Sequence, residues 1–192
     1  MSTVTARDQA KADRRAALLS AAASLFAERG FARVSLEDLG AAAGVSGPAV
    51  YRHFNGKQAV LAALLVGTSE GLWAGGQQVA DAAADPEAAL RKLIAFHVKF
   101  AVANPDVIRV QDRDLDSLSE DDRMTVRTLQ RNYIALWVKV LAGIHPDDDP
   151  TELRIRVRAA FGLINSTPHS ARTSPKSTVR ELLERMAWAA LR

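Results

Sequence analysis

The chain of 192 residues contains no cysteine, and its four histidines lie far apart in the sequence. The absence of cysteine excludes disulfides, thiolate metal sites and a cysteine nucleophile, and it suits a reducing compartment. The sequence also lacks the short motifs typical of zinc hydrolases, serine hydrolases and nucleotide-binding enzymes. We therefore expect no catalytic residues, no metal and no cofactor, although residues distant in the sequence can still converge into an active site.

No continuous apolar run reaches the roughly 18 residues that a membrane-spanning helix needs. The segment from Met1 to Arg15 is polar, unlike a signal peptide. Apolar residues make up 48% of the chain, which is enough to bury a substantial core. These features predict a soluble cytoplasmic protein that has no membrane partner.

Positive charge is concentrated at the start of the chain, although the net charge is only +3. Residues 1–65 carry eight Lys or Arg against five Asp or Glu, whereas the remainder carries 17 of each kind. A basic segment joined to a neutral body suits binding to a polyanion. The excess is small, however, and it also fits an ordinary solvated surface.

Proline and glycine divide the chain into helical segments, and no alternating strand pattern occurs. Asp85, Asn104, Asp149 and Ser174 each precede a proline, a pairing typical of helix N-termini. The predicted fold class is all-α, with about nine helices. They are one helix ending at residue 29, helices over 36–43, 47–53, 57 to the low eighties and 119–144, and helices starting near 86, 105, 150 and 175. Residues 165–174 and the charged segment 108–117 are predicted to be loops.

Residues 36–57 have the pattern of two short helices joined by a tight turn. Ser35 and Ser46 are the predicted N-caps of the two helices, and Gly44 can take the positive φ that the turn demands. Small residues at positions 41–43 are expected to let the helices approach closely. The segment is therefore predicted to be a helix-turn-helix.

The second of these helices separates an apolar face from a polar one. At roughly 100° per residue, Val50 and Phe54 share a face that is predicted to pack inward, and Arg52 lies opposite them. A helix in a DNA major groove needs this division. Arg52 is the predicted base reader, while Tyr51 and His53 on the flanks are predicted to donate to phosphates. The alternatives are a core aromatic at Tyr51 and a solvated arginine at Arg52.

Three stretches resemble the DNA-binding domain of the tetracycline-repressor (TetR) family of bacterial regulators. They are LFAERGF at 25–31, SLEDLGAAAGVS at 35–46 and AVYRHFNGKQAVL at 49–61, within about a quarter of the chain. The resemblance implies a homodimer with a helical C-terminal body whose last two helices form the interface. It also implies that a small-molecule effector bound in the body separates the heads from DNA.

The resemblance further implies which residues contact a double-stranded DNA operator. They are Ser35, Ser46, Gly47, Pro48, Ala49, Tyr51, His53 and Lys57, to which the helix pattern adds Arg52. Two positions depart from the family pattern. Gly47 has no side chain to aim at a base, and Glu37 stands where some members carry a basic contact residue, so the operator sequence is not predicted. Lys11, Arg14 and Arg15 either reach DNA from a mobile arm or remain solvated.

The body contains aromatic and polar side chains that are candidates for an effector site. They are Phe96, His97, Phe100, Arg109, Tyr133, Trp137, Phe161 and Asn165. The alternative is that the aromatics are core residues and that each polar group satisfies a local hydrogen bond. The charged segment that contains Arg109 and Arg113 is expected to be a solvated loop, and the alternative is that one of these arginines pairs with an anionic ligand group or connects the body to the head. The body pattern resembles that of regulators of acyl-CoA catabolism, so the effector is expected to be an acyl-CoA or another apolar metabolite.

The last two helices carry apolar residues on faces that suit a dimer interface. The predicted interface residues are Phe161, Gly162, Leu182, Met186 and Ala189. The alternative is a core within one chain, which accommodates both faces less readily.

We therefore predict a DNA-binding head at residues 1–56 and a ligand-binding and dimerisation body at residues 57–192. The predicted function is a ligand-responsive transcriptional regulator, in the family's usual role a repressor, which binds a palindromic operator as a dimer and is released by its effector. Two alternatives are a DNA-binding protein without ligand control and an enzyme with a fused DNA-binding head. A neutral body disfavours the first, because an architectural protein usually spreads basic charge more widely.

Overall fold

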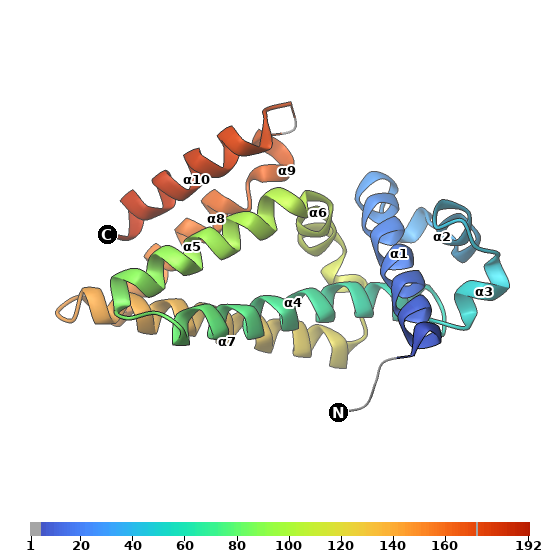
Figure 1. The fold of residues 1–192 in the computed structure, drawn as a ribbon, viewed down its shortest axis with the longest axis horizontal. Helices are drawn as coiled ribbons and strands as arrows, with labels where there is room; N and C mark the ends of the chain where they lie inside the picture. Colours follow the sequence, from blue (N-terminus) through green and yellow to red (C-terminus); the bar gives the residue numbers. More distant parts are fainter. Residues whose placement is uncertain (1–4, 172) are drawn as a thin grey trace.

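A computed structural model describes residues 5–171 and 173–192 of the chain. These residues form ten α-helices, two 3-10 helices and no strand, which confirms the all-α fold class (Figure 1). The α-helices are α1 (Ala6–Arg29), α2 (Leu36–Ala42), α3 (Gly47–Tyr51), α4 (Lys57–Asp81), α5 (Pro86–Ala103), α6 (Pro105–Asp114), α7 (Glu120–Ile144), α8 (Pro150–Ile164), α9 (Thr167–Ser170) and α10 (Lys176–Leu191). The 3-10 helices are η1 (Phe31–Arg33) and η2 (Leu115–Ser117).

Most predicted helix starts are confirmed, and short polar side chains show why the helices begin there. A proline begins α5, α6 and α8. Asp85 accepts a hydrogen bond from Ala88 N–H at 2.7 Å, and Asp149 accepts one from Thr151 N–H at 2.7 Å. Ser119 caps α7 in the same way. These bonds satisfy backbone donors that have no partner inside the helix.

Two of the caps predicted in front of prolines are wrong. The Asn104 side chain makes no bond to the first turn of α6, because it donates to Phe100 O at 2.9 Å in the preceding helix. Ser174 does not cap α10, because this helix begins at Lys176 and Pro175 occupies the cap position. At both sites the proline is close to the helix start, but the residue before it does not act as the cap.

The chain is more helical than predicted in three segments. Residues 108–117 form the end of α6 followed by η2, and not a loop. The four-residue helix α9 lies within the expected loop 165–174. Residues 11–15 belong to α1 and not to a mobile arm. Charged residues in these segments are therefore held on helix faces.

The helices form a small head at one end of an elongated body. α1, α2 and α3 make up the head, and α4 leads from the head along the body beside α7 (Figure 1). α5 packs against both of these helices, α8 packs against α7, and α10 packs against α5 and α8 to complete the body. α6 packs against α1, so two body helices, α4 and α6, hold the head.

Two hydrophobic cores stabilise these parts. The core of the head contains Phe26 and Leu39, but it also contains Leu61 of α4 and Val110 of α6. The core of the body surrounds Trp137 of α7, which is fully buried. The predicted boundary at residue 56 coincides with the start of α4. It does not separate two independently packed units, because α4 and α6 of the body contribute to the core of the head.

α4 is long and apolar enough, by length and composition alone, to cross a membrane, with a mean hydropathy of 1.3. In the structure it packs against α1, α5 and α7 and contributes Leu61, Leu64 and Leu65 to the first core. These contacts bury 33% of the most apolar stretch of α4.

Candidate functional site

The helix-turn-helix begins with a capped helix and a glycine turn. Ser35 Oγ accepts from Asp38 N–H at 3.0 Å, and Asp38 Oδ2 accepts from Ser35 N–H at 2.8 Å, so Ser35 is confirmed as an N-cap. The backbone and then the hydroxyl hydrogen bond from Ser35 hold the pKa of Asp38 below its ordinary value. Gly44 has a φ of +68°, which lets the chain turn into α3.

Gly40, and not the alanines at 41–43, lets α2 and α3 approach closely. Gly40 is buried, and a Cβ there would lie 2.9 Å from the carbonyl oxygen of Val45 and 3.3 Å from Val50. Two of the three alanines are exposed. A glycine inside a helix costs about 1 kcal/mol relative to alanine, so its presence was a signal that this position packs tightly.

α3 has the two faces that its sequence predicts. Val50 and Phe54 are 0% and 4% exposed and belong to the core of the head. Tyr51 is 58% exposed, and Arg52 is exposed as well. The helix is shorter than the predicted 47–53, because it ends at Tyr51 and Arg52 is its C-cap. Tyr51 is therefore a surface residue and not a core aromatic.

The start of α3 is open to solvent. Ser46 is the N-cap residue, but its side chain makes no capping hydrogen bond, so that predicted bond is absent and the hydroxyl is unused within the described residues. Pro48 is exposed, and Gly47 and Ala49 are half-buried. A Cβ at Gly47 would come no nearer than 3.8 Å to Glu37, an ordinary contact, so packing does not require glycine here.

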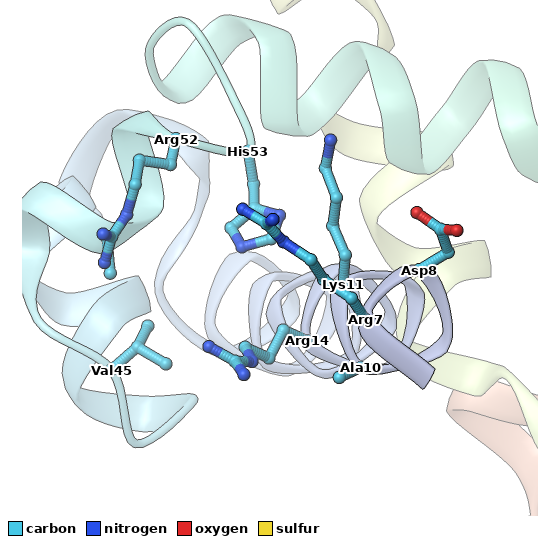
Figure 2. A pocket seen from close by; sticks show the side chains of 9 residues that line it. Arg7, Asp8, Ala10, Lys11, Arg14, Val45, Arg52 and His53 are labelled. Carbon is cyan, nitrogen blue, oxygen red and sulfur yellow. The ribbon is translucent and has the colours of Figure 1, made fainter. Parts of the chain in front are cut away.

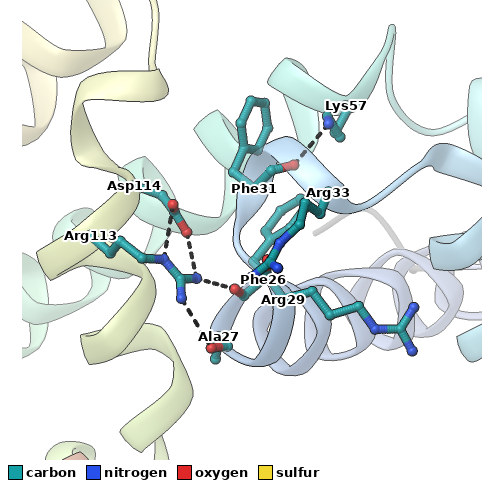
Figure 3. A network of polar contacts seen from close by, with 8 residues as sticks. All are labelled: Phe26, Ala27, Arg29, Phe31, Arg33, Lys57, Arg113 and Asp114. Atoms are coloured by element: carbon teal, nitrogen blue, oxygen red, sulfur yellow. Dashed lines mark hydrogen bonds and ion pairs between the residues drawn. The ribbon is translucent and has the colours of Figure 1, made fainter.

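Ser35 and Lys57 use their polar groups inside the head. Ser35 Oγ donates to Asp38 Oδ2 at 2.9 Å, which leaves no hydroxyl hydrogen for a phosphate. Lys57 Nζ donates to Phe31 O at 2.8 Å and to Ala32 O at 3.2 Å, and it lies 4.5 Å from the centre of the Phe31 ring. Figure 3 shows the first of these bonds. Both side chains therefore hold the backbone of the head in place. Two of the three N–H groups of Lys57 are used in this way, and the third remains for another partner.

A groove of about 740 Å³ lies between α3 and the first turns of α1 (Figure 2). Arg7, Lys11 and Arg14 line it from α1, and Ala49, Arg52 and His53 line it from α3 and the turn that follows. Of the described residues in the lining, Asp8 is the acidic one. His53 Nδ1 is buried and has no hydrogen-bond partner within the described residues. The groove therefore presents net positive charge beside the exposed face of α3.

The body contains a cavity of about 200 Å³ between α4, α5, α6, α7 and the end of α8. Five of the predicted effector residues line it, namely His97, Phe100, Tyr133, Phe161 and Asn165. Gln111 and Gln130 also line it and were not predicted, because a surface glutamine on an amphipathic helix gives no sequence signal of its own. Among the residues that the structure describes, no Lys, Arg, Asp or Glu lines the cavity. An apolar wall with a few uncharged polar groups is typical of small-molecule sites.

His97 is the most buried polar group of this cavity. Its Nε2 lies 3.2 Å from Asn165 Oδ1, and its Nδ1 lies 3.5 Å from Tyr133 Oη. Because Asn165 Oδ1 can only accept, Nε2 carries the proton and Nδ1 accepts from Tyr133. Burial lowers the pKa of His97 to about 4, against a smaller opposite effect of the Asn165 hydrogen bond. Burial likewise raises the pKa of Tyr133. Both side chains are therefore neutral at neutral pH.

The buried, neutral His97 predicts a specific loss of stability in acid. The unfolded chain takes up a proton near pH 6.5 and the folded chain only near pH 4, so stability falls as the pH drops through this window. Linkage gives a loss of about 2.5 kcal/mol between pH 7 and about pH 4.5 from this residue alone. Urea unfolding of the wild type and of His97→Gln at both pH values measures it. The variant should lose less stability in acid by about that amount, and equal losses would show that His97 is protonated in the folded state.

Three predicted effector residues do not line the cavity. Phe96 packs against a glycine of α4. Arg109 donates to Pro168 O at 3.0 Å and so connects α6 to α9. Trp137 is fully buried behind the cavity, with its ring edge-on to that of Phe161 at 4.9 Å between centroids. Trp137 therefore supports the cavity wall from behind, whereas Phe96 and Arg109 make contacts outside the cavity.

α6 connects the cavity to the head. Gln111 of this helix lines the cavity, and two residues later Arg113 reaches the carbonyl groups at the end of α1. Arg113 Nη1 donates to Ala27 O at 3.3 Å, and Nη2 donates to Phe26 O (Figure 3). Asp114 holds the guanidinium with two hydrogen bonds, of 3.1 and 2.9 Å. Of the two alternatives for this arginine, the connection between body and head is the one that the contacts show.

The outer faces of α8 and α10 expose apolar residues. Those on these faces include Ile155, Gly162, Leu182, Met186 and Ala189. Phe161 is different, because its ring stacks on that of His97 inside the chain, with centroids 4.7 Å apart. The ring therefore belongs to the cavity wall, and the place of Phe161 in an interface stays a prediction. Exposed large apolar side chains on adjacent helices suit contact with another subunit.

A compact helix-turn-helix head, mounted on a helical body that contains a cavity, defines a DNA-binding regulator of transcription. Comparisons with known proteins agree with this class. The family model of the bacterial regulatory proteins of the tetR family matches residues 18–64, and that of the tetracyclin repressor-like C-terminal domain matches residues 83–192. The chain belongs to the TetR family.

Individual relatives show the same relationship over most of the chain. The transcriptional repressor KstR2 of Rhodococcus jostii is 28% identical over 82% of this chain and 77% of its own length. The transcriptional regulator EthR of Mycolicibacterium smegmatis is 32% identical over 72% of this chain and 66% of its own length. The crystal structure of a TetR-family regulator from Bordetella parapertussis superposes with a TM-score of 0.83 at 26% identity, covering 92% of this chain and 93% of that one.

Proposed function

We propose that this chain is a ligand-responsive repressor that acts as a homodimer on a palindromic operator in the bacterial cytoplasm. In the dimer, two copies of α3 would enter successive major grooves about 34–36 Å apart. The observation that carries this proposal is the division of α3, in which Val50 is fully buried while Tyr51 is 58% exposed. The name of KstR2, a transcriptional repressor, supports repression.

The contacts of α3 with DNA follow from its open face. Arg52 is the proposed base reader, with guanine as the favoured target of its paired donors. Pro48 and Ala49 offer apolar contact, and Gly47 permits a close approach of the backbone. Ser46, Tyr51, His53 and the remaining N–H of Lys57 are proposed to bind phosphates. Ser35 is proposed to act by capping α2, because its hydroxyl is used in the cap and not on a phosphate.

The cavity lined by His97 and Asn165 is the proposed effector site. Its volume of about 200 Å³ is below the roughly 300–1,000 Å³ of a typical drug-sized site, so it suits a small apolar group such as the acyl part of a thioester. Occupation of the cavity would displace α6 and, through Arg113, the end of α1. The ensemble then shifts toward a head spacing that no longer fits the operator. This cavity is what favours ligand control over a DNA-binding protein without it.

The exposed apolar residues of α8 and α10 are the proposed dimer interface. Leu182 and Met186 are 43% and 41% exposed in the single chain, and Gly162 permits a close crossing of helices. An interface formed by the same two helices of each subunit is closed and two-fold symmetric. That symmetry matches a palindromic operator.

Substitution of Arg52 by Gln tests the proposed base reader. Operator duplexes selected from a random pool by the wild type serve as ligands, and fluorescence anisotropy gives the affinity for each base at every position. We expect discrimination at one base pair of each half-site to fall by about 1–3 kcal/mol, while preference at the other positions persists. Arg131→Gln, an exposed arginine of α7, is the matched control and should change nothing. Unchanged discrimination in Arg52→Gln would remove this residue as a base reader.

A further inference from the structure

The first three turns of α1 extend beyond the core of the head. The first buried residue of α1 is Leu18, so residues 6–17 bury no side chain. A capping box between Thr5 and Asp8 starts the helix. Packing therefore does not explain why this segment is helical and placed beside α3. A helical segment that lies beside α3 without contributing to the core is suited to binding something else.

The cations on this segment face the groove and have no partner in the described structure. Arg7, Lys11 and Arg14 follow a spacing of four and then three residues, which places them on one helix face, and all three line the groove (Figure 2). None of them forms an ion pair or a side-chain hydrogen bond among the described residues. Asp8 is occupied by Thr5, whose hydroxyl donates to it at 2.6 Å. Arg15 is different, because it lies over the ring of Phe54 at 5.1 Å and has a structural contact.

We propose that the groove between α1 and α3 binds backbone phosphates of the operator, with Arg7, Lys11 and Arg14 as the ligands on the α1 side. The inference rests on the proposed function, because α3 must lie in a major groove for the phosphates to be at hand. Ala49 and Arg52 line this protein groove and also belong to the proposed DNA-reading surface of α3. The bound strand is therefore the one that flanks the major groove of the DNA in which α3 lies. The like charges that line the groove repel one another, and a bound polyanion offsets this repulsion.

The dimensions of α1 fit this occupant. Arg7 and Arg14 are seven residues apart, which is about 10 Å along a helix. Successive nucleotides of one strand of duplex DNA rise about 3.4 Å each. The three cations therefore span about three nucleotides of a single strand. Such contacts add affinity and fix the register of α3, but they carry no sequence information.

The test is the salt dependence of binding to duplex DNA. The triple variant Arg7→Gln, Lys11→Gln, Arg14→Gln keeps helix propensity nearly constant. The matched control removes three exposed cations of the body by Lys99→Gln, Arg131→Gln and Lys139→Gln. Affinity is measured by fluorescence anisotropy at several salt concentrations, for a selected operator and for an unrelated duplex of the same length. Circular dichroism checks that α1 remains helical.

We expect the slope of log K against log salt to become shallower by about 0.9 for each lost phosphate contact, hence by about 2–3 for each subunit. The shift should be the same on both duplexes, so the ratio of operator to unrelated affinity stays constant. A slope equal to that of the wild type and of the control would overturn the inference, as would a fall in the affinity ratio at constant slope. If the wild type itself selects no operator, the proposed function fails. The salt slope on the unrelated duplex still shows whether the groove between α1 and α3 binds phosphates.

Discussion

Replacement of Arg113 by Met is expected to lower the free energy of unfolding by about 2–3 kcal/mol. The substitution leaves Asp114, whose side chain is 9% exposed, without its partner, and it removes the donors to Phe26 O and Ala27 O. The Arg113 side chain is 41% exposed, so solvent keeps the cost below that of a fully buried pair. Urea unfolding at pH 7 measures the change. Operator affinity should fall as well, because the head is no longer held against α6.

Two further variants separate the connection from general damage. Arg113→Met combined with Asp114→Asn should recover part of the lost stability, because no unpaired carboxylate remains. Arg109→Met changes the same helix but breaks only the bond to Pro168 O, so operator affinity should stay at the wild-type level. Additive losses in the double variant, or equal effects of Arg109→Met and Arg113→Met on operator binding, would contradict the role of Arg113 as the connection between body and head.

Alanine at Gly76 is expected to destabilise the protein, and alanine at Gly71 of the same helix is expected to stabilise it. A Cβ at Gly76 would collide with the ring of Tyr133, which lines the cavity. Overpacking of this kind costs about 1–3 kcal/mol, which outweighs the gain in helix propensity. A Cβ at Gly71 would meet no atom within 4 Å, so alanine there should gain up to about 1 kcal/mol.

Urea unfolding of the two glycine variants gives the comparison directly. Changes of the same sign would contradict the packing of α4 against α7. Because the Tyr133 ring must move to admit a methyl group, Gly76→Ala should also alter the cavity, whereas Gly71→Ala should leave it unchanged. The pair therefore distinguishes a glycine needed for close approach from one that only lowers helix stability.

Features that depend on neighbouring residues could be predicted from the sequence. The cap at Ser35, the caps at Asp85 and Asp149 and the two faces of α3 all arise within a few residues. The spacing of apolar residues then predicts the fold class, because it indicates which face of each helix packs against other helices.

Features that depend on distant residues could not be predicted in the same way. Arg113 meets Phe26 across 87 positions of the chain, and Lys57 meets Phe31 across 26. The charge-rich segment 108–117 has the composition of a loop, but Val107, Ile108 and Val110 bury one face of α6. Which cavity residues face inward is also a property of packing, so Phe161 could be assigned to both an interface and a cavity until the structure placed its ring against His97.

The most direct test of the central claim is oxidative labelling of Tyr51 with and without a selected operator duplex. Tyr51 is 58% exposed in the head, and Met124 is 55% exposed on α7 of the body, so Met124 serves as an internal reference. If α3 binds DNA with its open face, the operator should protect Tyr51 from hydroxyl radicals while the labelling of Met124 stays constant. Equal labelling of Tyr51 in the free and the operator-bound protein would contradict the account.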